Sequence, residues 1–256
     1  MKSKSGPTVL TRKKSAGGIL DTIKTIGYAV LIALVVRTVA YEPFNIPSGS
    51  MVPTLLVGDY LFVSKFSYGY SRYSLPFGLP LFSGRIFFHS PERGDVVVFK
   101  LPTDNSTDYI KRVIGLPGDH IQMKNGILFI NGQPIPRRRI EDYLYQEGNG
   151  AVIPLAQYIE TLPNGVQHRI IEMSDNGPLD NTQEYVVPPG DYFMMGDNRD
   201  NSTDSRVLSA VGYVPYENII GKAQIIFFSI RDGAHAWEVW RWPWTVRWNR
   251  LFNLVR

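Results

Sequence analysis

The chain has 256 residues, enough for one large domain or two modest ones with a real hydrophobic core. Hydrophobic residues make up 44% of it and charged residues 20%, which excludes a chain that is disordered throughout. The formal net charge is only +4, and the absence of cysteine excludes thiol catalysis, disulfide bonds and thiolate metal sites.

The first expected element is a single membrane-spanning helix over residues 23–41. Residues 26–36 carry no charge, and with Lys24 and Arg37 tolerated near the ends the stretch reaches the roughly 17–20 residues that a tilted helix needs. Basic residues between positions 2 and 14 predict that residues 1–22 form a cytoplasmic tail and that residues 42–256 lie outside. A cleaved export signal is the main alternative, since a buried soluble helix would show a polar face.

From residue 42 onward the sequence predicts a mainly β domain of antiparallel sheets. Short β-branched or aromatic runs alternate with Gly- and Pro-containing turns, and Asn125-Gly126 between two apolar runs predicts a hairpin. The clearest runs are residues 60–63, 95–99, 109–114 and 224–229.

Residues 131–187 differ from the rest of this domain in composition and in hydrophobic pattern. They are polar, with weaker strand patterns, and we expect them to form a smaller β-rich subdomain inserted into the main domain. The triplet Arg137–Arg139 within them is expected to be a solvated surface turn rather than a binding site.

Three segments contain residues that can carry chemistry, and the first runs from Ile46 to Leu55. Ser48 and Ser50 flank Gly49, and prolines constrain the backbone on both sides. This arrangement can present one hydroxyl as a nucleophile and another beside it as a hydrogen-bond donor. Taken alone, the segment is equally compatible with a Ser/Gly linker that leaves the membrane.

The second segment, residues 108–119, places Lys111 inside an apolar run. Strand alternation puts Lys111 on one face with Tyr109 and Val113. A lysine on a buried face loses hydration, which lowers its pKa, and a neutral amine can act as a general base. The alternative is a lysine on the solvent face of an amphipathic strand, which is the commoner case for a lysine considered alone.

The third segment, residues 194–206, alternates acids, bases and hydroxyls on a loop that begins with glycine, which predicts a dense hydrogen-bond network. Its odd positions imitate a calcium loop, but Arg199 occupies a ligand position and no glutamate closes the loop. Neither a metal nor another cofactor is expected, because no histidines have a ligand spacing. The four histidines are His89, His120, His168 and His235.

In combination and in this order, these segments resemble the bacterial signal peptidase I family, membrane-bound serine proteases that remove signal peptides from exported proteins. The resemblance rests on four blocks, P-S-G-S-M-x-P-T-L at 47–55, R-G-D-V-V-V-F at 93–99, D-Y-I-K-R-x-x-G-L-P-G-D at 108–119 and M-G-D-N-R-D-N-S-x-D-S-R at 195–206. The insertion and the C-terminal tail match loosely or not at all.

Carried over by motif, the resemblance implies that Ser50 is the nucleophile and Lys111 its general base. It implies that the Ser48 hydroxyl joins the Ser50 backbone N–H in an oxyanion hole and that Ser202 orients the Lys111 amine. A Ser-Lys dyad needs no histidine, and the sequence offers none in a suitable place.

The remaining site residues are also implied by the resemblance. Asp204 and Arg206 would pair to support the last loop. Shallow pockets would admit the small side chains at positions −3 and −1 of a signal peptide. The pocket residues would be Phe44, Ile46, Leu55, Tyr109 and Ile110.

These assignments predict an endopeptidase of the bacterial inner membrane with a periplasmic or extracytoplasmic catalytic domain, acting on exported preproteins through an acyl-enzyme. Ser50 is nine positions after Tyr41, so the nucleophile would lie within roughly 30 Å of the membrane exit. Two rival hypotheses are an inactive membrane-tethered binding module of the same fold and a self-cleaving repressor-type Ser-Lys protease.

All five tryptophans fall within residues 237–248, interleaved with arginines. Pro243 argues against one continuous helix, and the alternation of Trp240, Trp242 and Trp244 is that of a strand. We expect this tail to contact the phospholipid bilayer, with indoles at headgroup level, and we expect no nucleic-acid partner. A core strand is the alternative.

Overall fold

The computed structural model of the chain describes residues 19–75, 82–146, 151–231, 233–234 and 236–256. The chain divides into two compact units, residues 1–36 and 37–256. The predicted basic tail falls mostly on residues 1–18, which lie outside the described part, as does His235.

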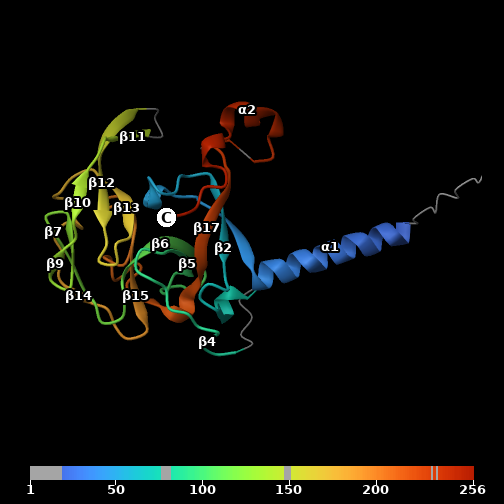
Figure 1. Cartoon of the computed structure of the whole chain (residues 1–256), viewed down its shortest axis with the longest axis horizontal. Coiled ribbons are helices and arrows are strands. Elements are labelled where there is room, and N and C mark those ends of the chain that lie inside the picture. Colours follow the sequence, from blue (N-terminus) through green and yellow to red (C-terminus); the bar gives the residue numbers. More distant parts are fainter. Residues whose placement is uncertain (1–18, 76–81, 147–150, 232, 235) are drawn as a thin grey trace, which may run out of the picture. The chain divides into compact units, whose positions relative to one another are not determined.

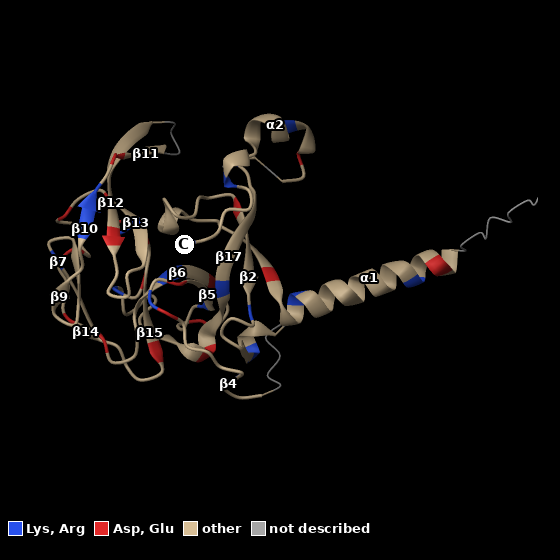
Figure 2. Ribbon diagram, in the orientation of Figure 1, with Lys and Arg blue, Asp and Glu red and all other residues tan. Residues whose placement is uncertain are grey.

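The helix α1 (Ile19–Val39) has no buried residue, and its charged residues lie near its two ends, with an uncharged stretch between them (Figure 2). By length and composition it can cross a membrane. It begins and ends earlier than the expected span of 23–41, because Tyr41 already belongs to the first strand.

A seven-stranded antiparallel sheet is the centre of the second unit, with the strand order β1-β2-β17-β5-β6-β15-β16 (Figure 1). The four runs predicted as strands all lie in this sheet, which confirms the mainly β fold class. Its strands are β1 (Tyr41–Asn45), β2 (Asp59–Ser64), β5 (Val96–Lys100), β6 (Asp108–Gly115), β15 (Asp191–Met195), β16 (Val214–Pro215) and β17 (Ile219–Ser229).

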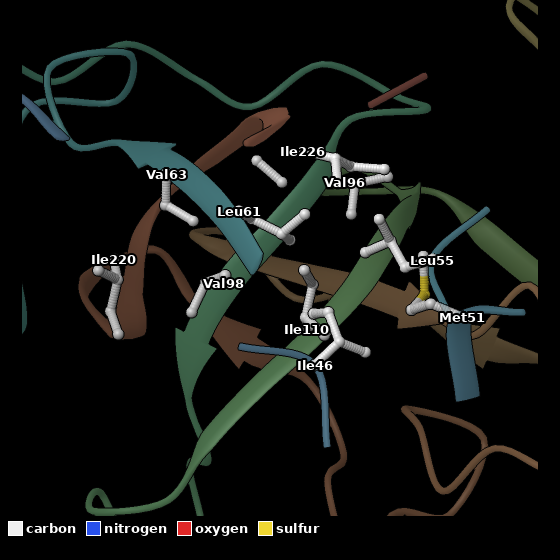
Figure 3. Packing of buried hydrophobic residues seen from close by; sticks show 11 residues of the cluster. Ile46, Met51, Leu55, Leu61, Val63, Val96, Val98, Ile110, Ile220 and Ile226 are labelled. Atoms are coloured by element: carbon white, nitrogen blue, oxygen red, sulfur yellow. The ribbon is translucent and has the colours of Figure 1, made fainter. Parts of the chain in front are cut away.

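The sheet is covered on both faces, so β6 is buried along most of its length. Ile110 packs into a cluster with Ile46 and Leu55 (Figure 3), whereas Val113 and Ile114 each belong to a different cluster. A strand buried on both faces reads as a continuous apolar run, so any polar side chain on it must be explained individually.

Two smaller sheets occupy most of the chain between β6 and β15. One has the order β14-β7-β8-β9, and the other joins β10, β11 and β13 to the long strand β12. The strands are β7 (His120–Lys124), β8 (Ile127–Ile130), β9 (Gln133–Pro134), β10 (Arg137–Arg139), β11 (Tyr143–Gln146), β12 (Val152–Thr161), β13 (Gln167–Glu172) and β14 (Tyr185–Val186). A further pair, β3 (Tyr70–Ser71) and β4 (Arg85–Ile86), completes the sheets.

The hairpin predicted from Asn125-Gly126 is confirmed between β7 and β8. Asn125 has φ of 49° and Gly126 has φ of 71°, the positive values that a two-residue primed turn requires. Here a local signal determines the structure because the turn residues alone set the chain reversal.

The prediction that the arginine triplet forms a surface turn is wrong. Arg137–Arg139 form strand β10, the blue strand in Figure 2, which pairs with β12. Arg137 forms ion pairs with Glu172 and Asp175, and Arg139 pairs with Asp142. Carboxylates supplied from elsewhere in the chain therefore allow a run of like charges to join a sheet.

The tryptophan-rich tail is not a strand either. It forms η5 (Val239–Arg241), α2 (Trp242–Thr245) and η6 (Trp248–Arg250), with Pro243 in the first turn of α2, where its missing N–H costs nothing. The residues after it return to the sheet, since Phe252 N–H donates to Ile226 O at 2.7 Å and Val255 N–H to Gln224 O at 2.9 Å.

A core position for the tryptophans is likewise excluded for four of the five. Trp237, Trp240, Trp244 and Trp248 are between 57% and 75% exposed, while the Trp242 indole packs on Phe228 with ring centroids 5.1 Å apart. Four of the tryptophans therefore lie at the surface of the described structure.

Candidate active site

Ser50 lies in the short helix η1 (Gly49–Met51), which is held in place by buried neighbours and by backbone hydrogen bonds. Met51 and Leu55 are fully buried, and Leu55 N–H donates to Met51 O at 2.9 Å. On the other side, Ile46 N–H donates to Asp59 O at 2.8 Å. The apolar positions of the segment therefore hold the backbone in the core while the two serines face the cavity described next.

A cavity of about 600 Å³ brings the three predicted segments together. It is lined by the first segment at residues 47–50, by the second at residues 107–111 and by the third at residues 200–203, with Leu179 and Val207. Segments far apart in the sequence thus place their hydroxyl, amine and carboxylate groups around one space.

Lys111 is 3% exposed and points at the nucleophile candidate. Its Nζ donates to Ser50 Oγ at 2.7 Å and to the Ile110 carbonyl oxygen at 3.0 Å. It also lies 5.2 Å from the centre of the Tyr109 ring, on the face that strand alternation predicted. The alternative of a solvent-facing lysine is therefore excluded.

Burial lowers the pKa of Lys111 to about 8 because the ammonium loses its hydration, while the more distant carboxylates of Asp204 and Asp197 oppose the shift. No carboxylate of the described residues forms an ion pair with it. A lysine desolvated without a counter-ion is the arrangement that makes a neutral amine available near neutral pH.

The other two serines lie at the same cavity with looser geometry. Ser48 Oγ is 3.5 Å from Ser50 Oγ, and its role as an oxyanion donor stays a prediction. Ser202 is buried and lines the cavity, but its Oγ forms no hydrogen bond to Lys111 among the described residues. Its orienting role stays a prediction.

The five predicted substrate-pocket residues separate into two groups. Four of them share one hydrophobic cluster, and the fifth, Tyr109, belongs to another. Only Tyr109 and Ile110 line the cavity itself. The four in the shared cluster are Phe44, Ile46, Leu55 and Ile110.

Asp204 and Arg206 form the expected ion pair, with both Arg206 Nε and Nη2 lying 2.9 Å from carboxylate oxygens. Asp204 also accepts from Gly196 N–H at 3.0 Å. The arginine keeps the pKa of Asp204 below its ordinary value although burial acts in the opposite direction. Asp204 therefore links the end of the third segment to Gly196 near its beginning.

Sequence reasoning missed a second buried pair, between Arg112 and Asp197. Arg112 Nε and Nη2 donate to the two Asp197 oxygens at 2.8 and 2.6 Å, and both side chains are inaccessible to solvent. Thr54 Oγ1 donates to the same carboxylate at 2.5 Å. The signal that could have found the pair is an arginine in an apolar strand, which needs an acid somewhere.

Gly196 was also missed, and its role is spatial. A Cβ atom there would lie 2.2 Å from Ser202 Oγ and 2.6 Å from the Ser50 carbonyl oxygen. Only glycine therefore lets the third segment pass directly over the nucleophile turn.

The sheet of β10, β11, β12 and β13 supports this loop through Arg199. Its guanidinium donates to both oxygens of Glu160 on β12, at 3.0 and 2.5 Å, and its backbone N–H donates to Ile171 O on β13 at 3.0 Å. His168 Nε2 lies 3.3 Å from the same Glu160. The histidine is thus part of a structural network, and the described residues contain no cluster of His, Asp or Glu able to hold a metal.

The model of the family described as "Signal peptidase, peptidase S26" matches residues 19–228. The chain belongs to this family. It is therefore a serine endopeptidase, a hydrolase of signal-peptide processing, and its exposed apolar helix fits a membrane anchor.

Curated relatives agree with the family match. The chain is 47% identical over 247 residues to signal peptidase I of Rickettsia canadensis, covering 90% of this chain and 91% of the relative. It is 44% identical over 243 residues to that of Rickettsia conorii, covering 88% and 89%. A crystal structure of a signal peptidase I from Enterococcus faecalis is 27% identical, with a TM-score of 0.32, covering 52% of this chain and 97% of that one.

We predict that Asp197→Ala in this signal peptidase lowers the free energy of unfolding by about 3–5 kcal/mol, because it leaves the Arg112 charge buried without a partner. Urea unfolding of the purified protein measures the loss. Asp142→Ala breaks the exposed pair with Arg139 and is the control, expected to cost less than about 1 kcal/mol. Equal losses in the two variants would contradict the prediction.

Proposed function

We propose that this signal peptidase cleaves exported preproteins with Ser50 as nucleophile and Lys111 as general base. The observation that carries the proposal is the 2.7 Å contact between Lys111 Nζ and Ser50 Oγ inside a buried site that favours the neutral amine. When the amine is neutral, its lone pair can accept the Ser50 proton, and the serine becomes the donor.

In the proposed reaction, Ser50 Oγ attacks the scissile carbonyl carbon while its proton passes to Lys111 Nζ. The Ser50 N–H and the Ser48 hydroxyl donate to the oxyanion. The Lys111 ammonium then gives its proton to the departing amine of the mature protein. Water, deprotonated by the neutral lysine, attacks the remaining ester, and the resulting ammonium returns a proton to Ser50 Oγ as the signal peptide leaves with a new carboxyl end.

The proposed specificity is for small side chains at positions −3 and −1. Ile110 lines the cavity beside Ser50 and is backed by Phe44, Ile46 and Leu55 of its cluster, so a bulky apolar group limits the space for a substrate side chain. Tyr109, at the lysine, would limit the pocket on its other side.

We also propose a single-pass topology in the bacterial inner membrane, with the basic residues 2–14 in the cytoplasm and residues 42–256 outside. The charge distribution of the sequence and the uncharged stretch of α1 over residues 26–36 support this orientation. The exposed tryptophans of residues 237–248 support contact of the tail with lipid.

The dyad is tested by comparing cleavage of a secretory precursor by the wild type, Ser50→Ala and Lys111→Ala. We expect each alanine variant to lose cleavage by roughly 10³-fold or more while it stays folded. Lys111→Arg should fail equally, because a guanidinium does not deprotonate. Lys124→Ala removes an exposed lysine and is the control. Cleavage near the wild-type rate by either alanine variant would overturn the dyad, whereas absence of cleavage by the wild type would favour the inactive binding module.

The pH dependence of kcat/KM tests the protonation state. The lowered pKa of Lys111, about 8, means that the catalytic neutral form is lost as the pH falls through this value. We expect the rate to rise about tenfold per pH unit below pH 8 and to level off above it. A flat profile between pH 6 and 8 would exclude Lys111 as the base.

Intrinsic fluorescence tests the tail without any variant, because every tryptophan of the chain lies in residues 237–248. We expect the full chain, reconstituted into vesicles whose acyl chains are brominated, to be strongly quenched relative to vesicles of the unbrominated lipid. Equal emission in the two kinds of vesicle would place the tail away from the bilayer.

A further inference from the structure

We propose that Asn198 is the positioning residue of the oxyanion hole, holding the peptide units on both sides of Ser50. The inference deepens the proposed function and depends on it, since it concerns how the Ser50 N–H is aimed. It assigns no proton transfer to Asn198.

Two hydrogen bonds connect Asn198 to the nucleophile turn. Its side-chain Nδ2 donates to the Gly49 carbonyl oxygen at 3.1 Å, and its backbone N–H donates to the Ser50 carbonyl oxygen at 3.1 Å. One residue of the third segment therefore holds the carbonyl groups that precede and follow the nucleophile's Cα atom.

The bond to Gly49 O has a consequence for the Ser50 N–H because both groups belong to the same peptide unit. That unit is planar and trans, so its C=O and N–H point in opposite directions. Fixing the carbonyl oxygen against Asn198 fixes the N–H on the other side of the plane. A donor at the carbonyl also polarises the unit, which makes its N–H a stronger donor to a developing oxyanion.

The orientation of the Asn198 amide follows from its partners. Gly49 O can only accept, so the NH₂ group and not Oδ1 must face it. Asn198 Oδ1 is buried and has no hydrogen-bond partner among the described residues. Asn198 is 2% exposed, so leaving its Oδ1 without a hydrogen bond is unfavourable. The amide keeps this orientation because its Nδ2 donates to the Gly49 carbonyl oxygen.

The loop that carries Asn198 is fixed independently of the nucleophile turn. Asn198 forms a parallel bridge with Ile171 of β13, and its two neighbours, Asp197 and Arg199, form the buried pairs with Arg112 and Glu160. An anchor must itself be rigid to aim another group, and these contacts make it so.

The test uses Asn198→Asp and Asn198→Leu in the full chain. Both remove the Nδ2 donor, and both leave Gly49 O with its second donor, Val52 N–H at 3.1 Å. We expect kcat on a precursor to fall roughly 10- to 100-fold with little change in KM, because the loss concerns the transition state.

A signal peptide that ends in an aldehyde supplies a readout that a purely structural role would not move. Ser50 adds to the aldehyde, and the resulting hemiacetal oxygen occupies the oxyanion position. Its inhibition constant should rise in parallel with the loss of kcat/KM, whereas the inhibition constant of the matching peptide acid should not change. Asn218→Asp is the matched control, since Asn218 Nδ2 also donates to a backbone carbonyl, Lys100 O at 3.0 Å, away from the cavity.

An equal loss of kcat in Asn218→Asp, an unchanged aldehyde inhibition constant or a failure of both Asn198 variants to fold would overturn the assignment. Full activity of Asn198→Leu would overturn it as well. Failure of the proposed function is recognised separately, because Ser50→Ala would then still cleave the precursor.

Discussion

Two consecutive cations on β6, Lys111 and Arg112, must both be buried for the site to exist, and they are treated in opposite ways. Their side chains project to opposite faces of the strand, so the sheet can give each a separate environment. Arg112 receives the Asp197 carboxylate in a two-point contact and stays charged. Lys111 receives a serine hydroxyl and a carbonyl oxygen, and no carboxylate from the part of the chain that the structure describes. The first becomes structural and the second becomes chemically usable.

The third segment makes this division possible, because it serves both faces of the strand. Asp197 neutralises Arg112, while Ser202 lies at the cavity that contains Lys111. The segment can come close enough only through Gly196, where any side chain would collide with the nucleophile turn. Its closing pair, Asp204 with Arg206, keeps another carboxylate engaged and away from direct contact with the lysine. The loop therefore controls charge as much as it controls shape.

Local patterns predicted much of the fold, and long-range pairing accounts for most of what they missed. The strands of the main sheet and the Asn125-Gly126 turn follow from residue type and period alone. The Arg112–Asp197 bond joins residues 85 positions apart, and no local pattern encodes it. Strand β10 was missed because its charges are neutralised from β13 and the residues beyond it. In the tail, spacing imitated a strand, but Pro243 favours a helical start. For the site, motif resemblance named the residues, and their proposed roles rest on chemistry that only kinetics can measure.

The contact between Arg199 and Glu160 has a thermodynamic consequence for how the protein loses its structure. The inserted sheet supplies Glu160 and Ile171, and the loop that they hold reaches the carbonyls beside Ser50. Melting of β12 and β13 would release a buried guanidinium and remove the support of the nucleophile turn at once. Opening of β12 and β13 is therefore coupled to loss of order in the loop that holds the Ser50 carbonyl group.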